Sequence, residues 1–285
     1  MSIKYLPRII DHQLSEYLDA MGAVLITGPK WCGKTTTAIQ KAKSVLKMQD
    51  PDKTKGYLAT AQFKPSLLLI GDNPRLIDEW QMAPVLWDAV RMAVDELDEP
   101  GLFILTGSTT IDNSQIMHSG TGRIARLFMR TMSLYESRES NGLISLRNLF
   151  EDKNLDIDGI KSQLSVERLI FATCRGGWPS SLLRNNEKAG LLIVKSYVDN
   201  ICETDISTVD GIRKDSVKVR ALLKSYSRNV STLASNTTIL KDINSNYESI
   251  AESTMYSYLD ALSKLFVIDE IPAWTPNIRS KSSIR

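Results

Sequence analysis

The segment "GPKWCGKTTT" (residues 28–37) places the strongest constraint on how this chain folds. It contains two glycines separated by four residues, and Lys34 and Thr35 directly follow the second glycine. This is the P-loop spacing, in which glycines allow the backbone to curl around a phosphate. The short apolar run "AVLIT" (residues 23–27) precedes the loop and is typical of a strand buried on both faces of a parallel sheet. The pattern therefore predicts a strand, a phosphate-binding loop and a helix, in that order.

The chemistry of the loop assigns a role to two of its side chains. Lys34 would reach the β- and γ-phosphates of a nucleotide, and the Thr35 hydroxyl would bind Mg²⁺. The four fixed positions coincide by chance in about one in a hundred chains of this length, so a glycine-rich turn with an incidental lysine is the minor alternative. Cys32 is either a low-pKa thiol at a helix N-terminus or, as we favour, a small residue that fits the loop. The residues expected to contact the nucleotide are Gly28, Pro29, Lys30, Trp31, Cys32, Gly33, Lys34, Thr35 and Thr36.

Two adjacent carboxylates end the apolar part of "PRLIDEWQ" (residues 74–81), which we expect to form a short strand. Asp78 is placed to bind Mg²⁺ through its water shell, and Glu79 to orient or deprotonate an attacking water. An acidic pair that merely caps the next helix is the alternative. Because a P-loop precedes the pair, the catalytic assignment is favoured.

The third predicted contribution comes from "LFILTGSTT" (residues 102–110), another strand of the buried type with polar residues at its end. We expect Ser108 to contact the γ-phosphate or the attacking water, although such residues also form turns. Farther along, Arg123, Arg126 and Arg130 are candidates for an arginine that stabilises transition-state charge, within the chain or from a neighbouring copy. Arg123 is favoured because a glycine flanks it, and the alternative for each is an ion-paired surface arginine.

Strands and helices alternate through residue 132, which predicts a parallel sheet with helices on both faces. "SVLKM" (residues 44–48) is the expected partner strand after the loop helix, and residues 86–97 carry a helical apolar stripe. Ligands of such sheets bind at the carboxyl ends of the strands. The loop, Asp78 and Ser108 are therefore expected to meet at one site.

Four blocks together resemble the prokaryotic AAA+-like P-loop ATPases that pair an AAA domain with a C-terminal domain of unknown function. They are "GPKWCGKTT", "PSLLLIGDNPRLIDEWQMAPVLWDAVR", "GLFILTGSTT" and "GRIARLFMRTMSLYES". The resemblance implies ATP as the nucleotide, Walker A roles for Lys34 and Thr35, and Walker B roles for Asp78 and Glu79. It also implies that Ser108 is the sensor residue. Longer members of this family continue into an endonuclease-like domain beyond the point that corresponds to Arg285, so we assign no nuclease activity to this chain.

The second half of the chain is predicted to be helical. A "GGWP" turn over the nucleotide, as in related ATPases, would let Arg175 act as a second phosphate sensor, although a helix C-cap is commoner. Three helices and a strand after residue 213 outline a winged helix-turn-helix. The third helix is scarcely basic, so a packing or interaction module is weighed above DNA binding. The predicted limits are an ATPase core over 1–145, a helical lid over 146–210, a winged-helix-like domain over 211–275 and a flexible tail over 276–285.

Composition excludes few classes of protein. The 35 basic and 33 acidic residues nearly balance, so any nucleic-acid contact needs local clustering of charge. Three scattered cysteines argue against a disulfide framework or a zinc site and favour a reducing compartment. The amino-terminal residues lack the apolar core of a signal peptide, and no membrane-spanning run is present. We therefore expect a cytoplasmic protein.

Two functions are consistent with these residues. The leading hypothesis is an ATP hydrolase that couples turnover to movement of the lid and winged-helix region. The alternative is a slow nucleotide-gated switch that binds DNA or a protein partner, with hydrolysis as its reset. A P-loop kinase is disfavoured because no site for an acceptor hydroxyl is evident. An arginine supplied by a neighbour would require a homo-oligomer.

Overall fold

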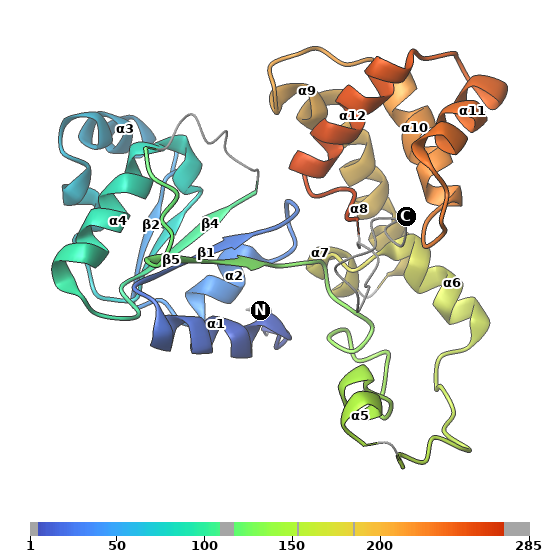
Figure 1. Cartoon of the computed structure of the whole chain (residues 1–285), viewed down its shortest axis with the longest axis horizontal. Coiled ribbons are helices and arrows are strands. Elements are labelled where there is room, and N and C mark those ends of the chain that lie inside the picture. Colours follow the sequence, from blue (N-terminus) through green and yellow to red (C-terminus); the bar gives the residue numbers. More distant parts are fainter. Residues whose placement is uncertain (1–4, 109–116, 153, 185, 271–285) are drawn as a thin grey trace, which may run out of the picture. The chain divides into compact units, whose positions relative to one another are not determined.

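The computed structural model describes residues 5–108, 117–152, 154–184 and 186–270 (Figure 1). The chain divides into two compact units, Met1–Val194 and Lys195–Arg285. The predicted limits of core, lid and winged-helix region do not coincide with this division and stay predictions. None of the helices in the described ranges is long and apolar enough to cross a membrane.

A five-stranded sheet with the order β2-β3-β4-β1-β5 forms the centre of the first unit, and every pair of neighbouring strands is parallel. The register places Thr27 opposite Gly107 and Phe128, and Asp78 opposite Thr106. The carboxyl ends of β1, β3 and β4 therefore lie side by side at one edge. The strands are β1 (Ala23–Thr27), β2 (Ser44–Lys47), β3 (Arg75–Asp78), β4 (Phe103–Gly107) and β5 (Ile124–Phe128).

Successive side chains of the central strands point to opposite faces, and each face has its own apolar core. Val24 and Ile26 pack with Leu14, Leu18 and Ala38 from α1 and α2, whereas Leu25 and Leu105 pack with residues of α3 and α4. Helices thus cover both faces of the sheet, which confirms the predicted α/β architecture (Figure 1). These elements are α1 (Ile10–Ala20), α2 (Lys34–Ile39), α3 (Thr54–Phe63), α4 (Val85–Leu97) and the 3₁₀ turns η1 (Pro65–Leu69) and η2 (Trp80–Met82).

Four helices follow the sheet. The second of them ends at Arg175 because Gly176 adopts a φ of 67°, so the glycine of the predicted turn stops the helix. The next begins at Pro179, whose missing N–H is tolerated in a first helical turn. The four are α5 (Leu146–Glu151), α6 (Val166–Arg175), α7 (Pro179–Leu182) and α8 (Glu187–Asn200), and α8 continues into the second unit.

In its described residues, 195–270, the second unit consists of helices joined by turns and contains no strand. Leu222, Ile243, Met255 and Leu262 are buried in its core. The three predicted helices are present, but residues 266–270 form no strand, and the rest of the predicted wing strand lies outside the described residues. A winged helix is therefore not confirmed. The elements are η4 (Ile201–Asp205), α9 (Ile206–Thr208), α10 (Ser216–Arg228), α11 (Asn236–Asn246) and α12 (Glu252–Lys264).

Gly28 is the glycine at which the loop leaves β1, and two observations make it irreplaceable. Its φ is 149°, and a Cβ atom there would lie 2.0 Å from the Met129 carbonyl oxygen. We expect Gly28→Ala to lower the free energy of unfolding by more than about 2 kcal/mol, measured by urea denaturation. Gly56 in α3 is the matched control, because a Cβ atom there meets nothing within 4 Å. Gly56→Ala should raise stability by about 0.5–1 kcal/mol. Equal stabilities of the two variants would contradict this account.

Candidate active site

The loop between β1 and α2 wraps around the Lys34 side chain. Lys34 begins α2 directly after Gly33, whose φ of 105° turns the backbone into the helix. Its Nζ atom is buried and donates hydrogen bonds to the carbonyl oxygens of Gly28, at 2.9 Å, and Pro29, at 2.8 Å. Burial lowers the pKa of Lys34, and the neighbouring Cys32 and carboxylates counter that effect. The arrangement holds a positive charge at the centre of the curled loop.

Asp78 connects three of the elements that meet at the carboxyl edge of the sheet. Its Oδ1 atom accepts hydrogen bonds from the Thr35 hydroxyl and the Thr106 hydroxyl, each at 2.6 Å. These oxygens come from α2, β3 and β4, and together they suit a hard divalent cation such as Mg²⁺. In the described ranges, no group of three or more His, Cys, Asp or Glu side chains could hold a metal. A site of one carboxylate and one hydroxyl is the kind that Mg²⁺ completes with phosphates and waters.

Glu79 follows Asp78 in a left-handed conformation, with a φ of 57°. This conformation ends β3, and the 3₁₀ turn η2 then brings Gln81 back toward Glu79. The Gln81 Nε2 atom donates a hydrogen bond to Glu79 Oε2, and the Ser108 hydroxyl lies 3.5 Å from the same oxygen. Sequence reasoning missed Gln81, although it lies only two residues after Glu79 and its amide could have been considered as a hydrogen-bond donor to that carboxylate. Thr109, which follows Ser108 after β4, lies outside the described residues.

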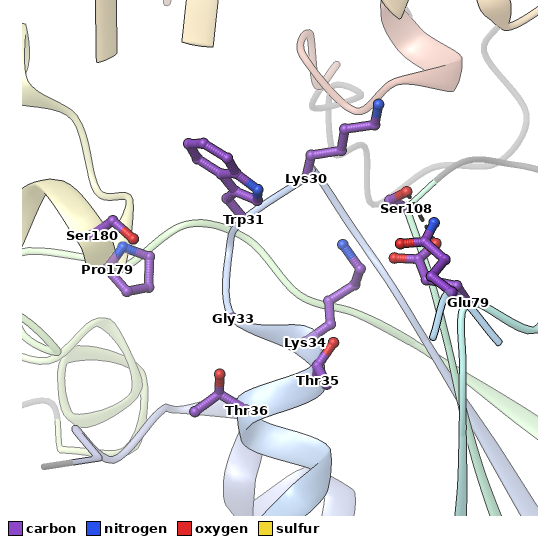
Figure 2. Close-up of a pocket in the computed structure, with 11 residues that line it drawn as sticks. Lys30, Trp31, Gly33, Lys34, Thr35, Thr36, Glu79, Ser108, Pro179 and Ser180 are labelled. Atoms are coloured by element: carbon purple, nitrogen blue, oxygen red, sulfur yellow. Dashed lines mark hydrogen bonds between the residues drawn. The ribbon is translucent and has the colours of Figure 1, made fainter. Parts of the chain in front are cut away.

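A pocket of about 560 Å³ opens over the loop (Figure 2). Its volume falls within the range of about 300–1,000 Å³ typical of small-molecule sites. The predicted loop, carboxylate and sensor residues that line it are Lys30, Trp31, Gly33, Lys34, Thr35, Thr36, Glu79 and Ser108. Pro179 also lines it and belongs to the predicted "GGWP" turn, whereas sequence reasoning missed Gln49 and Ser180. The remaining predicted loop residues, Gly28, Pro29 and Cys32, are not among the lining residues, and the first two instead bind Lys34 through their carbonyl groups.

Cys32 lies on the sheet side of the loop, and its side chain is 0% exposed. Its Sγ atom is 3.5 Å from the Met129 carbonyl oxygen. Burial raises the pKa of Cys32, against the opposing effect of Lys34 and Arg8. The low-pKa alternative therefore does not hold, and Cys32 acts as a small buried residue that seats the loop on β5.

Arg8, which precedes α1, holds the outer side of the loop and was not predicted. Its guanidinium donates to the carbonyl oxygens of Cys32 and Arg130, both at 2.8 Å, and pairs with Glu136 at 2.9 Å. Burial raises the pKa of Glu136, but hydrogen bonds from the backbone N–H groups of Ser133 and Ile9, with the charge of Arg8, hold it below its usual value. One buried cation thus joins the loop to the segment after β5.

Side chains of the predicted "GGWP" turn contact the backbone of the loop. Trp178 Nε1 donates to the Lys30 carbonyl oxygen at 3.1 Å, and a Cβ atom on Gly33 would lie 3.6 Å from Pro179 Cγ. Arg175 does not reach the pocket. Its guanidinium makes two hydrogen bonds to Glu139, at 3.0 and 2.8 Å. The suggestion that Arg175 is a second phosphate sensor is therefore wrong. Arg175 instead forms a buried ion pair with Glu139 at the end of α6.

Arg123 is the predicted catalytic residue that the structure does not bring to the pocket. It precedes β5, where its carbonyl oxygen accepts the Ala23 N–H at the amino edge of the sheet. Its side chain pairs with Asp95 at 2.7 Å. Lys34 lies at the opposite, carboxyl edge, so the prediction that Arg123 acts in catalysis within its own chain is wrong. The ion-paired alternative describes Arg123 here, and a contribution from a neighbouring copy stays a prediction.

The other two arginine candidates contact aromatic rings. The guanidinium of Arg126 lies 5.2 Å from the Trp87 ring centroid, and that of Arg130 lies 4.9 Å from the Phe128 ring centroid. Arg130 follows β5, so it belongs to the same edge of the sheet as the loop. Position in the sheet therefore favours Arg130 over Arg123.

Two family models match the chain. Residues 21–137 match the model described as an AAA domain, and residues 166–285 match a domain of unknown function (DUF8612). The first match covers the sheet and every predicted catalytic residue. It supports a nucleotide-binding domain of the AAA type over these residues.

Comparison with whole proteins gives relatives without an assigned activity. The chain is 25% identical over 267 residues to the uncharacterized proteins Rv2008c of Mycobacterium tuberculosis and Mb2031c of Mycobacterium bovis. The match covers 93% of this chain and 53% of each relative, so the chain spans about half the length of these proteins.

Two solved structures show weaker similarity. A DNA replication initiation factor is 12% identical with a TM-score of 0.32, over 90% of this chain and 86% of that one. Caenorhabditis elegans PCH-2 is 14% identical with a TM-score of 0.29, over 89% of this chain and 68% of its own. Neither score is high enough to indicate a shared fold over the whole chain.

The three cysteines should differ sharply in their reaction with a thiol reagent such as DTNB. Cys174 is exposed, whereas Cys32 and Cys202 are buried and have pKa values raised by burial. At pH 8 we expect one thiol of the native chain to react rapidly and the other two slowly. Cys174→Ser should remove the rapid phase, and the denatured chain should expose all three thiols. A rapid phase that survives in Cys174→Ser would contradict the buried position of Cys32.

Proposed function

We propose that this chain is a Mg²⁺-dependent ATPase that uses hydrolysis to change its conformation. The observation that carries the proposal is the pair of hydrogen bonds that Asp78 accepts from Thr35 and Thr106. Of these residues Thr35 lines the pocket, together with a buried lysine, Lys34, and a second carboxylate, Glu79. The match of residues 21–137 to an AAA domain also supports nucleotide binding at this site.

In the proposed binding mode, the curled loop surrounds the phosphates and Lys34 exchanges its contacts with two loop carbonyls for phosphate oxygens. Thr35 and Asp78 would hold Mg²⁺, directly and through water respectively. Bound there, the ion would neutralise charge on the phosphates. Thr106 keeps the Asp78 carboxylate oriented from the neighbouring strand.

In the proposed reaction, Glu79 accepts a proton from a water that attacks the γ-phosphorus, and the bond to the bridging oxygen of ADP breaks. Glu79 lines the pocket together with Lys34 and Ser108, so the base, the phosphate ligand and the sensor face one space. Ser108, near the Glu79 carboxylate, would contact the water or the γ-phosphate. Gln81 holds the carboxylate in this position.

Conformational coupling would pass through the turn that contains Trp178. This indole donates to the carbonyl of Lys30, a residue of the phosphate loop, and Pro179 packs near Gly33. Any rearrangement of the loop on phosphate binding would change these contacts. The turn connects α6 to α7, so the proposed movement is that of the helices after the sheet.

The nucleotide-gated switch is the second candidate, and the side-chain contacts favour a protein partner over DNA for it. Lys214 pairs with Asp210, Arg220 with Asp199 and Arg228 with Asp242, and Lys224 lies over the Tyr247 ring. These are four of the six Lys and Arg residues between 213 and 228. A phosphate-binding face needs cations that are not already neutralised within the fold.

Phosphate release from ATP with Mg²⁺ tests the leading proposal. Lys34→Ala should lose both binding and turnover, whereas Glu79→Gln should keep ATP binding and lose turnover by at least about a hundredfold. Lys55→Ala and Glu96→Gln are matched controls on exposed helix surfaces and should behave as the wild type. Full turnover in Glu79→Gln would contradict the assignment. ATP binding with negligible turnover in the wild type, with or without duplex DNA, would favour the switch.

Gln81 provides a separate test of how Glu79 is held. Gln81→Met removes the donated hydrogen bond at similar side-chain volume, and a hydrogen bond to a charged group contributes about 1.5–3 kcal/mol. We expect turnover to fall by about ten- to a hundredfold while the dissociation constant for ATP stays unchanged. Gln81→Glu should be at least as impaired, because two carboxylates would then repel each other. Turnover at or above the wild-type rate in both variants would show that Gln81 does not support Glu79.

A further inference from the structure

Trp31 is an unusual residue for a phosphate-binding loop. Its side chain is 63% exposed, and its backbone has a φ of 63°. This is the left-handed region, which residues other than glycine rarely occupy. Its indole lines the pocket. The phosphate chemistry described above uses Lys34, Thr35 and the two carboxylates, and it leaves this large aromatic ring without a role.

The backbone around Trp31 is held by two hydrogen bonds, so the fold fixes where its side chain leaves the loop. The Cys32 N–H bonds to the Pro29 carbonyl oxygen at 3.4 Å, which closes a turn around Trp31. The preceding carbonyl, that of Lys30, accepts the Trp178 indole N–H at 3.1 Å. The ring is therefore presented to the pocket by a loop that is held on both sides of it.

The pocket has two chemically different ends (Figure 2). Glu79 and Ser108 lie on one side of the loop, and Trp31, Pro179 and Ser180 lie on the other side. The first end carries the groups that act on phosphate and water. The second end carries an aromatic ring, a proline ring and a hydroxyl, which suit a flat apolar group better than an anion.

We infer that this second end is the slot for the base of the nucleotide, with Trp31 stacking on the base and Pro179 and Ser180 forming the opposite wall. The inference rests on the proposed function, since a bound triphosphate at Lys34 and Thr35 is what directs the base toward Trp31. Trp31 is thus a binding residue rather than a group that acts on the phosphates.

Stacking also determines how selective the slot is. Every base has a π-face, so stacking tolerates different bases. The indole N–H of Trp31 lies in the plane of its ring, parallel to a stacked base, so it does not reach the edge of that base. Among the other labelled side chains on this side of the loop, Thr36 and Ser180 carry hydroxyls, and a hydroxyl both donates and accepts. Neither hydroxyl distinguishes the amino group of adenine from the carbonyl group of guanine at the same ring position. The slot therefore accepts ATP and GTP with similar affinity.

Calorimetric titration with ATP, GTP and inorganic tripolyphosphate tests the inference, because tripolyphosphate has the phosphates without the base. In the wild type, ATP and GTP should bind within about fivefold of each other and both more tightly than tripolyphosphate. Trp31→Ala should weaken ATP and GTP by about tenfold or more and leave tripolyphosphate unchanged. Trp31→Phe should restore most of the loss, whereas Trp31→Leu, which lacks a π-face, should not.

The remaining outcomes distinguish failure of the base-binding inference from failure of the proposed function. Unchanged ATP affinity in Trp31→Ala, or an equal loss for ATP and tripolyphosphate, would overturn the role of Trp31 in base binding. Discrimination between ATP and GTP by more than about fiftyfold would overturn stacking as the basis of recognition. A wild type that binds neither ATP nor tripolyphosphate would instead overturn the proposed function. Tripolyphosphate binding by each variant also shows that the variant is folded.

Discussion

The two hydrogen bonds to Asp78 Oδ1 are the interaction on which the site depends. They tie Thr35, at the start of α2, to the ends of β3 and β4, where Thr106 lies opposite Asp78 in the strand register. A parallel sheet makes this possible because all its strands end at the same edge. The loop before α2, the oxygens of Thr35, Asp78 and Thr106, and the carboxylate of Glu79 are therefore placed by one feature of the topology.

The loop itself is held from three directions. Lys34 supports it from within, through the carbonyls of Gly28 and Pro29. Arg8 holds it from the segment before α1, and Trp178 from the turn after α6. These contacts use backbone carbonyl groups, which leave the side chains that line the pocket free to differ in chemistry. This division allows one end of the pocket to handle phosphates and the other to present an aromatic ring.

Sequence reasoning predicted the local parts of the site and failed where distant segments meet. Lys34 and Thr35 follow from a motif whose spacing is set within a few residues, and Asp78 follows from an acidic pair at the end of a short apolar run. Arg123 was misplaced because a flanking glycine says nothing about which edge of the sheet an arginine occupies, and it pairs with Asp95 at the amino edge. Arg175 was weighed as a phosphate sensor beside the commoner role of a helix C-cap, and Glu139, far from it in the sequence, neutralises it. Ion pairs of this kind leave no local signal.

The sequence by itself determined the parallel α/β sheet, the glycine-bracketed loop after β1 and the carboxylate pair at the end of β3, because hydrophobic periodicity and glycine spacing act over short stretches of chain. Only the tertiary structure decided which other residues reach the pocket. Gln49 comes to it from the turn after β2, whereas Pro179 and Ser180 both come from α7. Such contacts depend on how elements pack against each other, and packing is a property of the whole fold rather than of any one segment.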